Sequence, residues 1–501
     1  MNKQQWEHKA EKVRLETRPL IDGEFVASRS SKRYTKINPA SEEALVDAYE
    51  GSPDDVDTAV KSGRRAFTDG RWARIAPQER RDHLLRLVQL LIEHREELAL
   101  LDSLDVGKPI SQALSEVEMA CGYLRFAAEA SDKVLDDVLP SHPALLALNV
   151  REPVGVVGAI LPWNFPVVAV ALKIAPALAA GNSVVLKPSE LSPLSALRIG
   201  QLALEAGVPD GALNVVPGVG ATVGRTIAQH NDIDMLTFTG SSATGGMLLQ
   251  SAGESNLKKL LLECGGKSPH IVFSDAGDLD VVAADVVEQI TWNQGQVCIA
   301  GSRLLVEASI HADLLKRVIH LMAAISPGDP LDPATTYGPL VSGEHLKKVL
   351  GYVEAAKESG AQLRVGGRRA DRRGYFMEAT VFDGVRVNHP VACEEIFGPV
   401  MAVMPFSTRE EALSIAHSVN YGLSARIWTR DVAKGYALAR QLRAGEVTVN
   451  AAPVTQPGVG PAASTEPFGR SGFGVEGGLE GLRQYTRCKA IHINLPAERT
   501  R

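Results

Sequence analysis

The chain has 501 residues, which is too many for one hydrophobic core, so we expect it to divide into two or three domains. Its composition, 45% hydrophobic and 22% charged with a mean hydropathy of −0.02, is typical of a soluble globular protein. The 53 basic and 59 acidic residues leave a net charge of −6, which gives no indication of a nucleic-acid or anionic-membrane partner.

The cysteines and the chain start indicate the compartment. Five scattered cysteines form neither a CxxC pair nor a metal-ligand spacing, so we expect no disulfide framework, no metal site and a reducing compartment. Residues 1–18 are too charged for a secretory signal. The most apolar region, 154–186, is interrupted by three prolines, an asparagine and a lysine, which would be costly in a membrane span. We therefore expect a cytoplasmic protein with no membrane contact.

The N-terminal part of the chain is predicted to pass from short strands to helices. Residues 20–26 and 34–38 flank turn-like residues and predict a short β-hairpin with an extended arm. A helix is predicted to begin at Ser52, because a serine N-cap, a following proline and two acids favour a helix start. Helices continue to about residue 104, with an amphipathic run over 79–101. Another helix is expected over about 110–134.

Residues 135–150 combine two prolines with a strand-like run. This segment is either a projecting hairpin that contacts another subunit or an ordinary surface hairpin. The sequence leaves both interpretations open.

From about residue 154 the pattern changes to buried strands that alternate with helices. Continuous β-branched runs separated by helices indicate a parallel sheet covered on both faces. Such a doubly wound layout binds a nucleotide beyond the carboxyl ends of its strands. The expected strands are 154–161, 182–187, 212–216 and 235–239, and the expected helices are 167–180, 193–206 and 220–230.

A second α/β unit is expected to begin near Cys264. Its helix–strand alternation runs to about residue 443, and a long loop rich in proline, glycine and alanine follows over 451–466. The tail, 485–495, alternates like an edge strand that could complete a sheet with a partner. The expected strands before the loop include 270–273, 303–307 and 445–450.

A lone cysteine, Cys298, stands between a polar, glycine-containing turn and a run of small residues. A substrate and backbone N–H groups can approach a thiol closely there, and a thiolate is a strong nucleophile. A single cysteine is also often a small buried hydrophobe. The other motifs decide between these interpretations.

Two further motifs carry side chains suited to acyl chemistry. Two prolines lock the turn 162–166, where Asn164 could donate a hydrogen bond to a developing oxyanion, an interaction worth about 3–4 kcal/mol. Glu263 ends a strand before a glycine turn, and a partly buried glutamate can act as a general base for water, worth roughly 10²–10⁴-fold. Taken alone, Asn164 could be a turn residue and Glu263 a charged strand terminus.

Two motifs suit a dinucleotide. Lys187 and Glu190, at the carboxyl end of a strand, suit ribose hydroxyls, and the carboxylate would repel a 2′-phosphate, which favours NAD over NADP. The glycine-bearing helix start in 238–245 offers N–H groups to a pyrophosphate. A competing run, 218–224, has the spacing GxGxxxG instead of GxGxxG. The alternatives are a capped helix start with solvated charges and an ordinary turn.

Together these motifs resemble the NAD(P)-dependent aldehyde dehydrogenase superfamily of the hydrolytic, non-CoA-acylating type. Six motifs stand in that family's order, and the resemblance extends from about residue 21 to residue 489. The motifs are PWNFP (162–166), KPSE (187–190), FTGS (238–241), ECGGKS (263–268), NQGQVCIAGSR (293–303) and EEIFGP (394–399).

The resemblance implies an α/β fold with a Rossmann-like parallel-sheet NAD domain, a second α/β catalytic domain and a small β oligomerisation element. It also implies a homodimer or homotetramer. The implied divisions are 1–125 with 152–262 for the NAD domain, 263–445 for the catalytic domain, 126–151 with 480–501 for oligomerisation strands, and 446–479 for a substrate-entrance loop and a return to the NAD domain.

The resemblance also implies roles for individual residues. Cys298 would attack the aldehyde carbonyl, while the Asn164 amide and the backbone N–H of Cys298 hold the oxyanion. Hydride loss to the nicotinamide would leave a thioester, which water activated by Glu263 hydrolyses to a carboxylic acid. Lys173 and Glu476 match a secondary proton-relay pair. The residues matched to cofactor contacts are Trp163, Lys187, Ser189, Glu190, Gly220, Gly240, Ser241, Gly245, Glu395 and Phe397.

The substrate tunnel implied by the resemblance is apolar and carries no carboxylate for an ammonium group. We therefore hypothesise a medium-chain aliphatic or aromatic aldehyde, with an aminoaldehyde or γ-glutamylamino aldehyde as the alternative. A CoA-acylating enzyme is disfavoured by Glu263, and a non-catalytic NAD-binding protein has no reason to keep the three acyl-chemistry residues. The implied tunnel residues are Met119, Phe165, Val168, Leu172, Trp292, Val297, Ile299 and Phe468.

The sequence departs from the family pattern near the substrate entrance. The family's PFGGxKxSG motif is shortened in residues 467–472 and carries Arg470 in place of the second glycine. The loop 451–466 is several residues longer than usual. Arg487 stands where many relatives carry an acid, so we expect the subunit contacts to differ as well.

Overall fold

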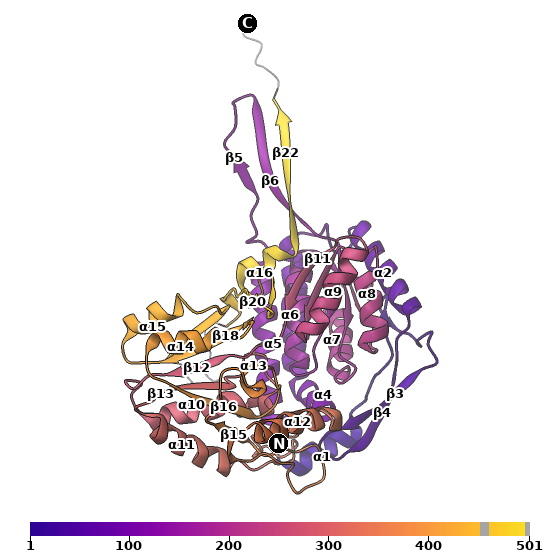
Figure 1. The fold of residues 1–501 in the computed structure, drawn as a ribbon. Helices are drawn as coiled ribbons and strands as arrows, with labels where there is room; N and C mark the ends of the chain where they lie inside the picture. The colour runs from indigo at the N-terminus through magenta and orange to yellow at the C-terminus, as the bar shows by residue number, and fades with distance from the viewer. Residues whose placement is uncertain (451–459, 496–501) are drawn as a thin grey trace.

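The computed structural model describes residues 1–450 and 460–495. Two lobes, each built on its own β-sheet, lie side by side, and a narrow three-stranded arm projects beyond them (Figure 1). The last strand of the chain lies in that arm, beside strands that come much earlier in the sequence.

The first lobe contains an eight-stranded sheet in the order β2-β1-β9-β8-β7-β10-β11-β21. Its central strands, β9 to β11, are parallel, and their order reverses between β7 and β10. The predicted doubly wound sheet is confirmed, and such a reversal opens a crevice beyond the strand ends. The strands are β1 (Leu20–Ile21), β2 (Glu24–Phe25), β7 (Val156–Ile160), β8 (Ser183–Lys187), β9 (Leu213–Val215), β10 (Met235–Thr239), β11 (Lys259–Glu263) and β21 (Gly472–Phe473).

Helices cover both faces of this sheet, which explains why its strands are apolar throughout. One face packs against α3 to α7 in a core that includes Leu124 and Ile174. The other face packs against α2, α8 and α9 in a core that includes Val60 and Ile227. The helices are α2 (Pro53–Thr68), α3 (Pro77–Glu93), α4 (Arg95–Val106), α5 (Ile110–Ala130), α6 (Pro166–Ala179), α7 (Leu194–Glu205), α8 (Arg225–Gln229) and α9 (Ser242–Glu254).

The second lobe contains a seven-stranded sheet in the order β14-β15-β16-β13-β12-β18-β19, in which only β14 is antiparallel to its neighbour. Helices α10 and α11 cover one face, and α12 to α15 cover the other. The elements are β12 (Pro269–Val272), α10 (Leu279–Thr291), β13 (Arg303–Glu307), α11 (His311–Ala324), α12 (Gly343–Glu358), β14 (Gln362–Val365), β15 (Thr380–Asp383), α13 (Pro390–Cys393), β16 (Val400–Phe406), α14 (Arg409–Ala416), β18 (Ser424–Trp428), α15 (Val432–Ala439) and β19 (Glu446–Val449).

The arm is an antiparallel sheet of β5 (Asp137–Leu139), β6 (Leu145–Pro153) and β22 (Thr486–Asn494). Strand β22 pairs with β6 along its whole length, and its other edge has no neighbour among the described strands. The predicted hairpin over 135–150 does project, and the predicted tail strand is confirmed as an edge strand. Short connecting elements are β3 (Arg33–Asn38), β4 (Glu43–Tyr49), β17 (Tyr421–Gly422), β20 (Phe468–Gly469) and α16 (Gly478–Gln484).

Local chemistry explains where the predicted helix at Ser52 begins. The Ser52 hydroxyl accepts a hydrogen bond from the backbone N–H of Asp55 at 3.1 Å, and the Asp55 carboxylate accepts one from the Ser52 N–H at 2.8 Å. This reciprocal capping box satisfies two N–H groups that the helix itself leaves free. The predicted start of α2 is therefore confirmed.

Several boundaries differ from the predictions. The charged N-terminus forms a helix, α1 (Lys3–Lys12), that we did not predict. The expected helix over 79–101 is broken at His94 into α3 and α4. The helix expected over 220–230 consists of a π-helical turn, η1 (Gly220–Gly224), followed by the short α8.

Two loop predictions also change. The hairpin expected from 20–26 and 34–38 is wrong: β1 pairs with β2 and β9 in the first sheet, whereas β3 pairs with β4. Of the long loop predicted over 451–466, residues 451–459 lie outside the described residues, and η3 (Gly460–Ala462) is a short 3-10 helix. No helix within residues 1–450 and 460–495 is long and apolar enough to cross a membrane.

Candidate active site

Four of the predicted motifs meet at one edge of the first sheet. Strands β7, β8, β10 and β11 are parallel, and Ile160 lies beside Lys187 while Thr239 lies beside Glu263. The chain leaves β7 into the turn 162–166 and leaves β10 into the N-terminus of α9. Because the strand order reverses between β7 and β10, these motifs surround the crevice in which doubly wound sheets bind their ligands.

The loop that carries Cys298 belongs to the second lobe and follows α10 through the short helix η2 (Trp292–Gly295). Asn293 and Gln294 have φ values of +46° and +57°, a left-handed conformation that is unfavourable for residues with side chains. Gly295 continues this path, and a Cβ atom there would lie 2.4 Å from the carbonyl oxygen of Gly398. The sharp turn packs the loop against its neighbours and leaves Cys298 half-buried.

Asn164 joins the first lobe to this loop. Its Nδ2 donates to the carbonyl oxygen of Gln296 at 2.9 Å, and its own carbonyl oxygen accepts from Asn293 Nδ2 at 3.0 Å. A Cβ atom at Gly266 would lie 2.4 Å from the carbonyl oxygen of Cys298, so the run 263–268 packs against the loop too. The structure therefore brings Asn164, the Glu263 motif and Cys298 together.

The surroundings of Cys298 hold its thiol in the protonated form. Burial raises the pKa of the Cys298 thiol to about 12, and the carboxylates of Glu395 and Glu263 raise it further by disfavouring a second negative charge. The predicted nucleophile is therefore not activated by its protein neighbours alone. A positive charge placed near these carboxylates would favour the thiolate.

Glu263 is a buried carboxylate, and its Oε1 has no hydrogen-bond partner among the described residues. Burial and the nearby charge of Glu476 raise its pKa well above the ordinary value, whereas Lys173 lowers it. Lys173 is itself buried and forms an ion pair with Glu476. The predicted relay pair therefore lies within electrostatic reach of the predicted base.

The predicted ribose contacts come together at the end of β8. Lys187 Nζ donates to the carbonyl oxygen of Pro188 at 2.7 Å and lies 3.4 Å from Glu190 Oε2. The Ser189 hydroxyl accepts a hydrogen bond from the backbone N–H of Leu191, which is a contact within the same turn. The Lys187 side chain also packs against Gly224, whose added Cβ would lie 3.6 Å away.

The predicted glycines differ in what surrounds them. A Cβ at Gly240 would lie 2.5 Å from the Phe238 ring, and one at Gly245 would lie 2.9 Å from Cys264 Sγ. Both positions therefore need a residue without a side chain. Gly220 begins η1 and faces open space. Ser241 is the N-cap of α9 and accepts from the Thr244 N–H at 3.2 Å.

The last predicted cofactor residues lie on the second lobe. Glu395 Oε1 accepts from the Gly266 N–H at 3.0 Å, and burial raises the pKa of Glu395. Phe397 has a φ of +60°, and its carbonyl oxygen lies 2.7 Å from His345 Nε2. The Trp163 ring packs edge-on against Phe397, with centroids 5.3 Å apart. His345 was not predicted, because a histidine on a helix carries no recognisable spacing.

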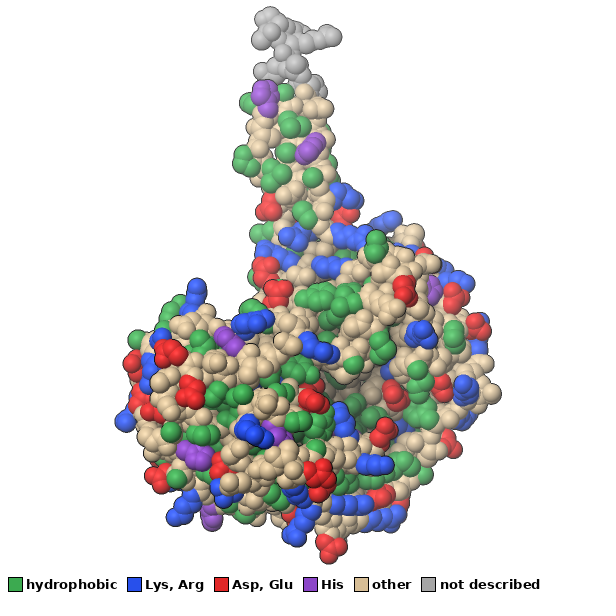
Figure 2. Space-filling view, in the orientation of Figure 1, with side chains coloured by type: hydrophobic (Ala, Val, Ile, Leu, Met, Phe, Trp, Pro, Cys, Tyr) green, Lys and Arg blue, Asp and Glu red, His purple; other side chains and the backbone are tan. Residues whose placement is uncertain are grey.

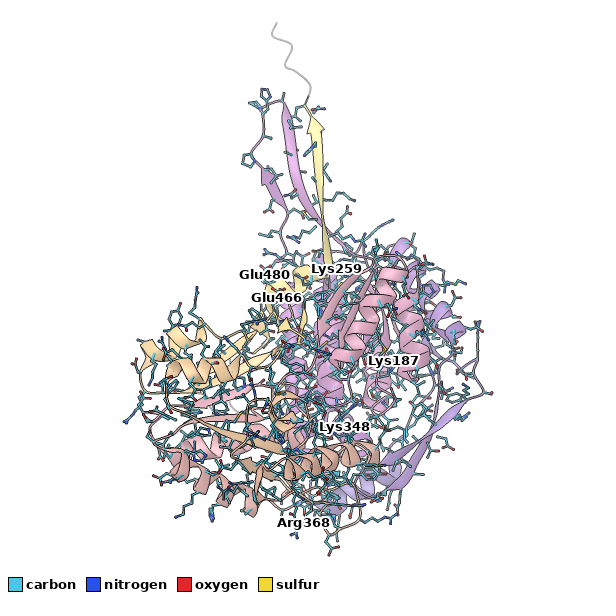
Figure 3. All side chains as sticks on the ribbon, in the orientation of Figure 1. Lys187, Lys259, Lys348, Arg368, Glu466 and Glu480 are labelled. Atoms are coloured by element: carbon cyan, nitrogen blue, oxygen red, sulfur yellow. The ribbon has the colours of Figure 1, made fainter. Side chains whose placement is uncertain are left out.

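A cleft of about 490 Å³ runs between the lobes from the N-terminus of α9 to Glu395. Lys187 and Lys348 come from different lobes (Figure 3), and Lys348 lines this cleft. The free N–H groups of α9 with lysine and arginine side chains suit a pyrophosphate, and the Lys187–Glu190 pair suits a ribose. These residues therefore fit a dinucleotide. The cleft is also lined by Ser241, Ser242, Tyr352, Glu394, Tyr421 and Arg470.

The shortened motif around Arg470 still packs against the residues of the site. The Arg470 carbonyl oxygen accepts from Ser242 Oγ at 2.6 Å, and Ser471 Oγ donates to the Gly265 carbonyl oxygen at 2.7 Å. Strand β21 then pairs with β11, placing Gly472 opposite Glu263. The backbone of this segment thus covers the end of β11 despite the missing residues.

The predicted tunnel residues fall into several environments. The Phe165 and Trp292 rings pack 5.1 Å apart, and Phe165 contacts the cores of both lobes. Trp292 also lines an open cleft of about 580 Å³, whereas Leu172 lines a small apolar hollow of about 30 Å³. Val168 and Val297 are buried, Ile299 is half-buried, and Met119 and Phe468 are exposed.

The cleft beside Trp292 contains a carboxylate that we did not predict. Glu288 lies one helical turn before Trp292 and lines the same cleft, together with Ser115 of α5. The sequence motif begins only after Glu288, so the motif offered no signal for it. Within residues 1–450 and 460–495, no group of three or more His, Cys, Asp or Glu residues could hold a metal ion.

Comparisons with known proteins point to one family. A family model described as the aldehyde dehydrogenase family matches residues 25–491. The chain is 43% identical to the Escherichia coli protein described as NADP/NAD-dependent aldehyde dehydrogenase PuuC, over 98% of both chains. It is 44% identical to the aminoacetaldehyde dehydrogenase of Pseudomonas aeruginosa, over 96% of both chains.

The solved structures include similar proteins. One is a mutant of the indole-3-acetaldehyde dehydrogenase AldA of P. syringae in complex with NAD⁺ and IAA. It superposes with a TM-score of 0.96 at 44% identity, covering 99% of this chain and 100% of that chain.

The raised pKa of Cys298 predicts slow alkylation in the cofactor-free protein. At pH 7.5, iodoacetamide should label Cys298 at least about tenfold more slowly than free N-acetylcysteine, because only the thiolate reacts. Glu395→Gln should speed the labelling of Cys298, since it removes a nearby negative charge. Mass spectrometry of each cysteine against time measures both rates. Labelling of Cys298 as fast as that of free N-acetylcysteine would contradict the electrostatic argument.

Proposed function

The chain belongs to the aldehyde dehydrogenase family, and from this premise we propose how its residues oxidise an aldehyde to a carboxylic acid with NAD. The observation that carries the proposal is the meeting of Cys298, Asn164 and Glu263 where the two lobes face each other. A nucleophile, an amide donor and a buried base are the groups that such a reaction needs.

In the first step, the Cys298 thiol gives its proton to the ionised Glu263, which passes it on through the Lys173–Glu476 pair. Cys298 Sγ bonds to the aldehyde carbon, and the carbonyl electron pair moves to the oxygen. The Asn164 amide and the backbone N–H of Cys298 donate to this oxygen, which replaces Gln296 O as the acceptor for Asn164 Nδ2. When bound, NAD would supply the acceptor for the hydride that leaves the aldehyde carbon. The carbon remains bonded to Cys298 as a thioester.

In the second step, Glu263 takes a proton from a water molecule, whose oxygen bonds to the thioester carbon. The carbon–sulfur bond breaks, and Cys298 leaves as a thiolate with the acid as product. The raised pKa of Glu263 suits a base that works near neutral pH. The Lys173–Glu476 pair is positioned to pass the proton away from Glu263.

The charge near the ribose contact supports NAD over NADP. The Glu190 carboxylate lies 3.4 Å from Lys187 Nζ, and it would repel a 2′-phosphate at this position. Ser241 and the N-terminus of α9 would take the pyrophosphate, while Glu395 and Phe397 would place the nicotinamide end.

For the substrate, we propose an apolar aliphatic or aromatic aldehyde, because Phe165 and Trp292 pack together beside the nucleophile loop. The related structure of an indole-3-acetaldehyde dehydrogenase supports this choice. Glu288, in the cleft beside Trp292, favours the alternative of an aminoaldehyde, and a relative is an aminoacetaldehyde dehydrogenase.

The arm supports a proposed homodimer or homotetramer. Figure 2 shows hydrophobic side chains along it, and β22 has a free edge among the described strands. Leu135 and Val138 are more than 60% exposed, and large apolar side chains gathered on a surface often mark a contact with another protein. A second copy of the chain would cover them. The five free thiols support a reducing, cytoplasmic location.

Replacing the nucleophile and the base should stop the reaction at different stages. Cys298→Ala should lower aldehyde-dependent NADH formation below about 10⁻³ of wild type. Glu263→Gln should keep a burst of about one NADH per subunit and slow turnover roughly 10²–10⁴-fold, because the thioester accumulates. Stopped-flow absorbance with NAD and hexanal measures both, with Cys488→Ala as the control. Full activity of Cys298→Ala would overturn the mechanism.

In wild type, the steady-state rate should rise with pH as Glu263 ionises through its raised pKa.

The role of Glu288 separates the two substrate classes. If an ammonium group binds in its cleft, Glu288→Gln should lower kcat/KM for 3-aminopropanal about fivefold and leave that for hexanal within twofold. Exposed Glu358 on α12 offers a matched control as Glu358→Gln. Equal kcat/KM losses with both aldehydes would exclude a charge contact.

The arm can be tested by placing a charge on it. Ile493→Asp should shift the protein to a smaller assembly in size-exclusion chromatography with light scattering, because a carboxylate would be buried unpaired at the contact. Ile92 has the same 45% exposure and lies on α3, away from the arm, so Ile92→Asp is the control. An unchanged mass for Ile493→Asp would contradict an interface at β22.

A further inference from the structure

The turn that carries Asn164 rests on two buried ionisable side chains from the end of α4. Lys108 follows the helix after Gly107, whose φ of +72° ends α4, and its Nζ donates to the Asn164 carbonyl oxygen at 2.8 Å. Asp102, two turns earlier, accepts from the Val167 N–H at 3.3 Å. One residue thus holds the start of the turn, and the other holds the first turn of α6.

Lys108 has little freedom to move. Its ammonium group pairs with both carboxylate oxygens of Glu116 on α5, and both side chains are 0% exposed. The same ammonium lies 4.1 Å from the centroid of the Phe165 ring. A buried ammonium group stays beside its partners, because moving away would leave its charge unpaired in a low-dielectric environment.

The Asn164 carbonyl oxygen accepts from both lobes. Lys108 approaches it from the first lobe and Asn293 Nδ2 from the second, while Asn164 Nδ2 donates to Gln296. The peptide plane after Asn164 is therefore fixed by a cation on one side and by the nucleophile loop on the other. The direction of the Asn164 side chain follows from this backbone placement.

We propose that Lys108, held by Glu116, is a positioning residue that aims the Asn164 amide at the oxyanion. The proposal rests on the proposed function of Asn164 and goes beyond it, since Lys108 itself touches neither the substrate nor Cys298. An oxyanion donor must lie within about 2.7–3.1 Å of the developing charge, so a small shift of the turn costs rate.

A second buried pair, between Lys36 on β3 and Asp105 near the end of α4, provides a matched control. Lys36 is also buried, and its Nζ lies 3.2 Å from the carboxylate of Asp105 on α4. Lys36 donates to the carbonyl oxygens of Asp105 and Leu191, and the Asp105 carboxylate accepts from the Leu194 N–H at the start of α7. This pair has the same chemistry as Lys108–Glu116, but its ion pair and hydrogen bonds do not involve the Asn164 turn.

The test is a double-mutant cycle of Lys108→Met and Asn164→Ala, read by acylation of Cys298 without cofactor. In 4-nitrophenyl acetate, Sγ attacks the carbonyl carbon, the oxygen becomes the oxyanion, and 4-nitrophenolate leaves. Lys108→Met should slow this acylation about 10- to 100-fold in the wild-type background and less than twofold in the Asn164→Ala background. Lys36→Met should change it less than twofold.

The outcomes separate this inference from the proposed function. If Asn164→Ala slows acylation but the loss from Lys108→Met is the same in both backgrounds, Lys108 does not act through Asn164 and only the inference fails. If Asn164→Ala has no effect, the proposed oxyanion donor fails and the inference fails with it. Should Lys108→Met not fold, judged by its thermal midpoint, the cycle is run with Lys108→Met/Glu116→Gln, which leaves no uncompensated carboxylate.

Discussion

The hydrogen bond from the Asn164 amide to the Gln296 carbonyl oxygen is the contact on which the site depends. It spans 2.9 Å and joins a turn of one sheet to the nucleophile loop of the other. Asn293 closes the same junction from the opposite direction. Because both donors are buried, an unmade bond would leave a polar group without water, so the two lobes are held in one relative placement. The distance between the donor and the attacking sulfur is a consequence of that placement.

The charges around this junction keep Cys298 in its neutral thiol form when no ligand is bound. Three carboxylates, Glu263, Glu395 and Glu476, disfavour a thiolate at Cys298, and among them only Glu476 has an ion-pair partner among the described residues. The same burial that raises the pKa of the thiol also raises that of Glu263, which makes its ionised carboxylate a stronger base. One feature, exclusion of water, therefore restrains the nucleophile and tunes the base. A cationic ring bound between the lobes would offset the first effect.

Much of the fold was predictable because its signals are local. The β-branched runs before Pro162 and Lys187 indicate strands buried on both faces, and Ser52 indicates a helix start through its capping box. The break at His94 and the π-helical turn at Gly220 were not predictable, because the helical pattern continues through both and tertiary packing decides the boundary. The exposure of Met119 and Phe468 and the burial of Val297 also depend on packing that a motif match does not describe.

By itself, the sequence determined the chemical inventory: a cysteine, an amide, a carboxylate and glycine turns in a recognisable order, because short motifs encode local backbone shape and reactive groups. Only the tertiary structure decided which of these groups meet. It placed Asn164 against the nucleophile loop, set Lys108 beneath that turn and put Glu288 beside Trp292. It also raised the pKa of Cys298 and Glu263. The Asn164 and Lys108 contacts join residues 132 and 56 positions apart, and burial depends on the whole fold, so no local pattern carries them.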